Sequence, residues 1–178
     1  MRILSILAVA LALAALATPL SARPPQGPQT LKDYLSEAEA DQIRDADSPA
    51  VRIKLYISFA EDRVKKFEYE MNRPVPDRRR SDILNSLLNG YSGCVDDAAD
   101  QIATAEQKHV DIQDQLKMME AKDKEFLPIL EKYDKDGPAF EDFKDNLEDA
   151  IDATKDAISD IDDAMKEATP GPIRRKPS

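Results

Sequence analysis

The sequence predicts an all-α protein, folded as an antiparallel helical bundle of four to five helices. Apolar residues recur at spacings of three and four over most of the chain, which is the period of an amphipathic helix. No segment alternates apolar and polar residues over a sustained stretch, as a half-buried strand would. Between the periodic segments stand prolines that can end one helix and start the next, namely Pro49, Pro74, Pro76 and Pro138.

Residues 1–22 predict export. A short basic start leads into a run over residues 3–16 that is apolar except for Ser5, and the segment that follows ends in a small residue at Ala22. These are the parts of a secretory signal peptide, and the run is short for a membrane span. We expect cleavage after Ala22, with cleavage after Ala17 as the alternative and an uncleaved anchor as the rival interpretation. Arg23 stands where a lipoprotein would carry its lipidated cysteine, so we expect a periplasmic or secreted protein without a stable membrane anchor.

Charge and cysteine content exclude several classes of function. The chain has 25 basic and 35 acidic residues, which give a formal net charge of −10. Because phosphate binding needs a basic surface, we expect no nucleic acid and no anionic membrane as a main partner. Cys94 is the only cysteine, so no internal disulfide can form. Its place among apolar positions predicts a buried, inert thiol, with an intermolecular bridge as the alternative.

A single helical-bundle domain is predicted over residues 30–168. Residues 23–29 are rich in proline and lack apolar periodicity, so we expect a flexible leader there. The basic, proline-rich residues 169–178 are expected to form a disordered tail. The first helix is predicted to start at Thr30, whose side chain can cap it while Asp33 lies three residues further on, as in a capping box.

The second helix is predicted from Ser48 to about Asn72. Ser48 suits the N-cap, and Pro49 suits the first helical position, where its missing N–H costs nothing. Two prolines within residues 73–81 end this helix. The same loop contains a basic cluster that could contact an anion or a protein partner, formed by Arg73, Arg78, Arg79 and Arg80. The alternative is a solvated loop whose arginines pair with the acidic helices.

Residues 81–135 carry an unusually regular pattern. From Leu84 to Tyr133 the apolar positions alternate spacings of four and three, and Asp123 fills one of the inward positions. This pattern is typical of a helix that packs along a coiled-coil-like seam. Two structures fit it: the chain turns near residues 108–111 and forms two helices, or it continues as one long central helix. We favour the turn because isolated helices of that length are rare in single domains.

The last helix is predicted from Pro138 to Ala168. Gly137 can adopt the conformation that ends the preceding helix, and Pro138 suits the first position of the next one. Acidic residues after Pro138 would lie near the positive, N-terminal end of the new helix dipole, which is a stabilising position for them. We therefore interpret the sequence around Gly137 as a corner between two helices.

Residues 134–145 resemble an EF-hand calcium loop in part. Asp134 and Asp136 stand at the first and third ligand positions. The fifth and sixth positions are Pro138 and Ala139, where the loop requires an oxygen ligand and a glycine. We do not expect calcium binding here, and Asp134 and Asp136 remain unspecific metal candidates.

Glu106 and His109 form a second metal candidate. Their Glu-x-x-His spacing is used in carboxylate-bridged di-iron bundles, but such sites need the motif twice and His109 is the only histidine. His109 also lies on the seam, which favours a partly buried polar residue that sets helix register. With one histidine and one cysteine, no set of nucleophile, base and orienting residue can be named. We expect neither enzyme activity nor a cofactor.

Two short segments carry resemblances to known proteins. Arg52–Leu55 reads Arg-Ile-Lys-Leu, and Phe59–Arg63 follows the pattern Phe-Ala-x-x-Arg. Together they resemble, over residues 35–68, a recurrent segment of uncharacterised, exported bacterial all-helical proteins, which implies export and a helical fold but no activity. Residues 35–39, "LSEAE", are similar to the Leu-Thr-x-x-Gln signature of periplasmic stress chaperones, with Ser36 in place of Thr and Glu in place of Gln.

The sequence therefore favours an exported, non-enzymatic helical-bundle protein that acts through protein–protein interaction or self-association. The seam-like helices, the acidic surface and the lack of a catalytic set support this interpretation. Its partner would be an unidentified protein or a second copy of the chain. The alternative is a periplasmic chaperone-like or divalent-cation-buffering envelope protein, which the chaperone-like segment and the Asp-rich helix faces suggest.

Overall fold

The computed structural model describes residues 33–135, 137–138 and 140–167. The predicted signal peptide, leader and basic tail lie outside these residues. Within them the structure consists of helices and connecting turns, with no strand, which confirms the all-α class. None of the described helices combines the length and the apolar character that crossing a membrane requires.

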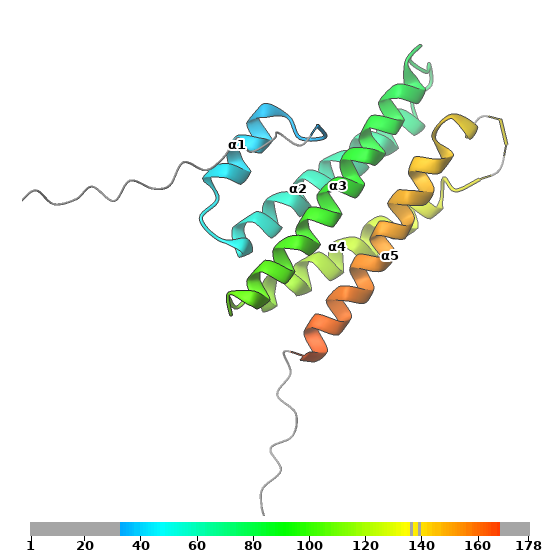
Figure 1. The fold of residues 1–178 in the computed structure, drawn as a ribbon. Helices are drawn as coiled ribbons and strands as arrows, with labels where there is room; N and C mark the ends of the chain where they lie inside the picture. Colours follow the sequence, from blue (N-terminus) through cyan, green and yellow to red (C-terminus); the bar gives the residue numbers. More distant parts are fainter. Residues whose placement is uncertain (1–32, 136, 139, 168–178) are drawn as a thin grey trace, which may run out of the picture. The chain divides into compact units, whose positions relative to one another are not determined.

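Four long helices form the bundle, and a short one lies outside it (Figure 1). The elements are α1 (Glu37–Asp45), α2 (Pro49–Met71), α3 (Arg80–Gln107), α4 (Gln113–Glu131), the 3-10 helix η1 (Glu141–Phe143) and α5 (Lys144–Glu167). Helices α2 to α5 run alternately up and down, which confirms the predicted antiparallel bundle (Figure 1). Helix α2 packs against α3 and α4, and α5 packs against the same two helices.

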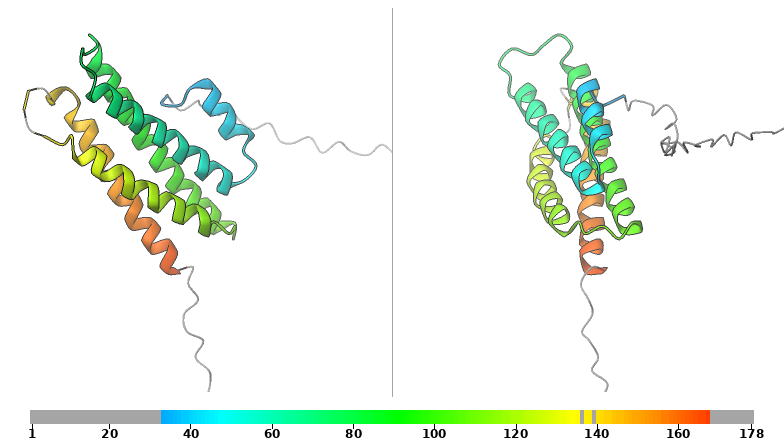
Figure 2. Two further views of the ribbon diagram at one scale, coloured as in Figure 1. Left: turned by 180° about the vertical axis from the view of Figure 1, so that it is seen from behind. Right: turned by 90° about the vertical axis from the view of Figure 1, so that its left-hand side faces the viewer.

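Helices α3 and α4 therefore face each other diagonally across the core. Their aromatic rings meet there, with Tyr91 and Phe126 edge to face and their centroids 5.9 Å apart. A second aromatic contact closes one end, where Phe67 of α2 lies 5.5 Å from the ring of Tyr133. Helix α1 contributes no buried residue and lies on the outside of α2 (Figure 2).

The regular pattern of residues 81–135 divides into two helices, as the favoured interpretation predicted. Helix α3 ends at Gln107, and His109 takes a positive φ of 52°, which a right-handed helix does not accommodate. The N–H of Val110 donates to the carbonyl oxygen of Ala105 and closes the last turn. One long central helix is thereby excluded. The seam itself persists on both helices, because all of its positions except His109 are buried.

The predicted start of the first helix is wrong. Thr30 itself lies outside the described residues, but residues 33–35 form a turn, and helix α1 begins at Glu37 with Ser36 as its N-cap. The Ser36 hydroxyl oxygen accepts the N–H of Glu39, and the Glu39 carboxylate accepts the N–H of Ser36. This capping box satisfies two free N–H groups at the helix start. Asp33 lies in the turn before it and has no capping role.

The predicted start of the last helix is also wrong. Helix α4 already ends at Glu131, well before Gly137, whose φ of 135° belongs to the connecting turn. Pro138 lies in that turn, and α5 begins only at Lys144, after η1. The reason is the packing of Phe143, which is buried in η1 with its ring centroid 6.3 Å from that of Phe67. Tertiary packing thus places the start of the last helix later in the chain than the local helix signals predict.

Candidate functional site

The predicted arginine cluster lies at the loop between α2 and α3, at one end of the bundle (Figure 1). Two of its members are used within the fold. Arg73 pairs with Glu70 at 3.2 Å, and its guanidinium carbon lies 6.0 Å from the ring centroid of Tyr69. Arg80 donates to the main-chain oxygen of Met71 at 2.9 Å and so links the two ends of the loop.

Arg78 and Arg79 remain available. Both side chains are exposed, and neither forms an ion pair or a side-chain hydrogen bond with any residue that the structure describes. Two large apolar side chains are also exposed in this part of the chain: Val75 in the α2–α3 loop, with 77% of its surface exposed, and Tyr69 near the end of α2, with 65%. Among the described residues, Val51 is the only other large hydrophobic residue that is exposed. We call the following group the tip surface: Tyr69, Arg73, Val75, Arg78 and Arg79.

The metal candidates that the structure describes do not gather into a site. Glu106 and His109 are both exposed, and His109 lies in the α3–α4 turn, so its predicted place on the buried seam is wrong. The turn needs a residue in the left-handed region, which histidine enters more readily than branched residues do. Asp134 is exposed, and Asp136 lies outside the described residues. In the described part of the chain, no three His, Cys, Asp or Glu side chains gather as a metal ion would require.

A groove at the opposite end of the bundle was not predicted. Two adjoining pockets of about 260 and 330 Å³ lie between the last turns of α3 and α5, the start of α4 and the α3–α4 turn. They share Glu106 and Ala164 in their lining. Carboxylates surround an apolar floor, and we call this region the acidic groove, defined by Ile102, Glu106, Leu116, Met119, Asp160 and Ala164. It combines residues from three helices, so no single stretch of sequence indicates it.

Asp123 is a fully buried carboxylate in the middle of α4. Neither of its carboxylate oxygens has a hydrogen-bond partner among the described residues. Burial therefore raises the pKa of Asp123 to about 7. The hydroxyl groups of Tyr91 and Thr154 share a 2.7 Å hydrogen bond, and burial together with the Asp123 charge raises the pKa of Tyr91. Because Asp123 lines neither pocket of the acidic groove, we assign it to the packing of the helix core rather than to ligand binding.

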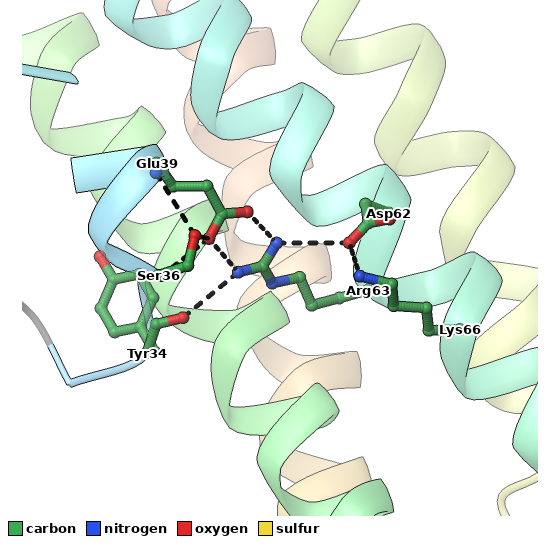
Figure 3. Close-up of polar contacts among 6 residues, drawn as sticks. All are labelled: Tyr34, Ser36, Glu39, Asp62, Arg63 and Lys66. Atoms are coloured by element: carbon green, nitrogen blue, oxygen red, sulfur yellow. Dashed lines mark hydrogen bonds and ion pairs between the residues drawn. The ribbon is translucent and has the colours of Figure 1, made fainter. Parts of the chain in front are cut away.

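One polar cluster fastens α1 to the bundle (Figure 3). The Arg63 guanidinium donates to both carboxylate oxygens of Glu39, at 2.7 Å from Nη2 to Oε2, and to the main-chain oxygen of Tyr34 at 3.3 Å. The hydrogen bond from Arg63 lowers the pKa of Glu39 to about 2. The stabilisation is therefore complete above the unfolded pKa of 4.5 and is lost as the pH falls towards 2. The Tyr34 hydroxyl donates to Asp97 of α3.

We call this cluster the α1 clasp, formed by Tyr34, Ser36, Glu39, Arg63 and Asp97. Sequence reasoning missed it because the contacts join positions far apart in the chain. Glu39 acts twice, as the capping-box residue of α1 and as the partner of Arg63. The chaperone-like residues Ser36 and Glu39 thus have a structural role in this fold.

Two glycines of α3 shape the surface under the clasp. A Cβ atom at Gly93 would lie 2.7 Å from the Tyr34 ring, too close for any real contact. A Cβ atom at Gly90 would lie 3.4 Å from Nε of Arg63 and 3.8 Å from the Tyr34 carbonyl oxygen, at ordinary contact distances. Gly93 therefore provides the space in which the Tyr34 ring lies.

Replacing Gly93 with alanine is expected to displace Tyr34 and loosen α1. Alanine favours the helix by about 1 kcal/mol over glycine, so α3 itself should not suffer. The amides of α1 should exchange with solvent at least tenfold faster, as measured by hydrogen exchange. The matched control is Gly90→Ala, in the same helix, which should leave α1 protected. Equal exchange of α1 in both variants would contradict the role given to Gly93.

The comparisons with known proteins leave the site to be interpreted from its own residues. The chain matches no protein-family model, no curated protein and no solved structure. The resemblance of residues 35–68 to exported helical proteins therefore stays a prediction. The regions from which a function can be inferred are the tip surface, the acidic groove and the α1 clasp.

Proposed function

We propose that this protein is an exported, non-enzymatic binding module that holds an acidic segment of another protein on its tip surface. The observation that carries the proposal is that the end of α2 and the loop after it expose two large apolar side chains, Tyr69 and Val75. The same part of the chain exposes Arg78 and Arg79, whose side chains form no ion pair within the described residues. Tyrosine and arginine are enriched among the residues that supply most of the binding energy at protein interfaces.

The charge of the chain supports an acidic partner at this place. With a net charge of −10, the molecule repels an acidic protein in general. The arginines of the tip surface reverse this locally, so they would orient the partner and accelerate its association. Such binding weakens with salt, because exposed charges are screened beyond about 8 Å at physiological ionic strength.

The loop is suited to binding at low entropic cost. Pro74 and Pro76 restrict the backbone around Val75. Arg73 lies over the Tyr69 ring and also pairs with Glu70. These contacts limit the conformations of the Arg73 and Tyr69 side chains. Fewer conformations are then lost when a partner binds, which favours affinity.

We expect a photo-crosslinker introduced at Val75 to capture an acidic protein in cells that express the full chain. The same crosslinker at Val51, the other exposed valine, should give no adduct. The double variant Arg78→Glu, Arg79→Glu should reduce the Val75 adduct at least tenfold, because it reverses the charges that attract the partner. The measurement is the adduct yield on gels, with mass spectrometry to identify the captured protein.

A matched charge control separates the tip surface from a general charge effect. Lys65 and Lys66 are also adjacent, exposed basic residues of α2, and they form i,i+4 ion pairs with Glu61 and Asp62. Replacing both lysines with glutamate should leave the Val75 adduct within twofold. Equal loss in both double variants, an adduct with a second copy of the chain, or no adduct at Val75 would each contradict the proposal.

A further inference from the structure

We propose that the acidic groove binds the chain's own basic segment Ile173–Lys176, which follows α5 along the chain. The groove lies at the end of the bundle where α3 meets α4 and α5 ends, whereas the tip surface lies at the other end (Figure 1). The two proposals therefore rest on different residues, and either can fail alone.

The groove suits an apolar side chain flanked by positive charges. Its floor is apolar, with Ile102, Leu116 and Met119 buried beneath it. Small side chains on the facing turns of α3 and α5 leave the space open: Ala99, Ala103, Ala157 and Ala164. Each of the two pockets is large enough for an isoleucine side chain.

The rim of the groove has carboxylates that lack a counter-ion. Glu106 and Asp160 are exposed, and within the described residues neither side chain forms an ion pair. Asp163, also in the lining, pairs with Lys166 at 2.8 Å and is thus already neutralised. The negative end of the α5 dipole adds to the field at this place. A cationic segment is therefore attracted here.

The sequence after α5 has the complementary pattern. Ile173 is the apolar residue, and Arg174, Arg175 and Lys176 follow it directly. A peptide of one apolar side chain next to three cations matches an apolar floor with two unpaired carboxylates. A basic segment of this kind stands out in a chain whose net charge is −10.

The connection is long enough to allow binding within one molecule. Between Glu167 and Ile173 the chain reaches roughly 20 Å when extended. The groove residue Ala164 lies only about 4.5 Å before Glu167 along α5. The dipeptide Pro170-Gly171 is typical of a turn, so it provides a point where the chain can reverse. A short connection also gives the segment an effective concentration in the millimolar range, which favours its own groove over that of a second copy.

Amide spectra of the full chain test the proposal. The variant Ile173→Ser, Arg174→Glu, Arg175→Glu should show shifted amide resonances at Ala103, Glu106 and Ala164 relative to the unmodified chain. Gly90 lies on the other side of α3 and should not shift, because it faces Arg63. A synthetic peptide of residues 168–178, added to this variant, should shift the same groove resonances back with a dissociation constant of roughly 1 mM or below.

Charge exchange between the groove and the segment makes the test specific. Glu106→Lys, Asp160→Lys should weaken binding of the peptide at least tenfold, and a peptide with Arg174→Glu, Arg175→Glu should bind this variant better than it binds the original groove. Asp149→Lys, an exposed position of α5 outside the groove lining, should change the affinity less than twofold.

Three outcomes would overturn the proposal. The groove resonances could be the same in the full chain and in the segment variant. The peptide could bind the Glu106→Lys, Asp160→Lys variant as well as it binds the original groove. The groove shifts of the full chain could grow with protein concentration, which would assign the groove to the segment of a second copy.

Discussion

The variant Asp123→Asn is expected to be about 4 kcal/mol more stable than the original protein at pH 8, and to gain less than half as much at pH 5. Asp123 is fully buried, its carboxylate oxygens have no partner among the described residues, and burial raises its pKa to about 7. Each unit by which the folded pKa exceeds the unfolded value of 3.8 corresponds to about 1.4 kcal/mol against the ionised folded state. Asparagine has nearly the same shape and no charge, so it avoids this penalty.

The direction of the pH dependence follows from proton binding. Between pH 4 and pH 7 the folded protein keeps the Asp123 proton, whereas the unfolded chain has lost it. The folded state therefore binds more protons, and the free energy of unfolding falls as the pH rises through this window. Above pH 7 the contribution becomes constant. The usual stabilising carboxylate behaves in the opposite way, as Glu39 does, because its folded pKa is lowered.

Urea denaturation at pH 5, 6, 7 and 8 measures this effect. The quantity to compare is the difference in unfolding free energy between Asp123→Asn and the original protein at each pH, since other acidic groups contribute to both. The control is Asp149→Asn, an exposed position of α5, for which the difference should stay within about 0.5 kcal/mol at every pH. Parallel curves for Asp123→Asn and the original protein would show that burial does not raise the pKa of Asp123.

Asp123 also changes the interpretation of polar residues on the seam. The sequence pattern placed both His109 and Asp123 at inward positions, and His109 was expected to be the polar residue that sets register. The structure moves His109 into an exposed turn and leaves Asp123 buried between Met119 and Phe126 of the same helix face. A polar group within an apolar seam can fix helix register at a cost in stability. In this bundle Asp123 is the buried polar residue of the seam that lowers the stability of the fold.

Burial was predictable where it depends on helical period alone. From Leu84 to Tyr133 the apolar spacing located the buried face on two different helices, because the same period governs both. The helix ends were harder to predict. The start of α1 depends on the space at Gly93 and the partner of Glu39, and the start of α5 depends on how Phe143 packs. These are contacts between distant residues, which local capping signals do not contain.

The candidate sites differ in the same way. The positions of the arginines in the sequence were enough to locate the arginine cluster. The structure was needed to show that Arg73 and Arg80 make contacts within the fold. Arg78 and Arg79, in contrast, are exposed. The acidic groove uses side chains of three helices, so the sequence offers at most alanines at helical spacing as a signal. The Glu106–His109 pair looked like a metal motif on a continuous helix, and the turn at His109 removes that helix.

Replacing Arg63 with methionine is expected to detach α1 while the four-helix bundle stays folded. Helix α1 has no fully buried residue, Leu35 before it and Ile43 within it add partly buried apolar contacts with the core, and the α1 clasp supplies its polar attachment. The side chains of Arg63 and Glu39 are 10% and 15% exposed, and removing one partner of such an enclosed pair costs about 3 kcal/mol. Methionine keeps the apolar stem that packs beside Gly90, so the variant removes the charge and hydrogen bonds and little else.

Hydrogen exchange distinguishes local detachment from general destabilisation. If the attached state of α1 becomes about 3 kcal/mol less stable relative to the detached state, the amides in Glu37–Asp45 should exchange roughly 100-fold faster. The core amides of α3, such as those of Leu88 and Val95, should keep their protection, because both residues are buried in the core that the four long helices form. A uniform acceleration across α1 to α5 would instead mean that α1 belongs to the cooperative core.

The matched control for this variant is Lys66→Met, on the same helix. Lys66 pairs with Asp62 at 2.7 Å, but both side chains are largely solvent-exposed, and pairs of this kind contribute less than about 0.5 kcal/mol. Exchange of α1 should therefore be unchanged in Lys66→Met. If both variants behaved alike, the attachment of α1 would have to come from Tyr34 and its contact with Gly93 instead. The Arg63 side chain donates to the main-chain oxygen of Tyr34, and the Tyr34 ring occupies the space at Gly93. If the α1 clasp opens as one unit, the double variant Arg63→Met, Gly93→Ala should therefore exchange its α1 amides little faster than the more affected single variant.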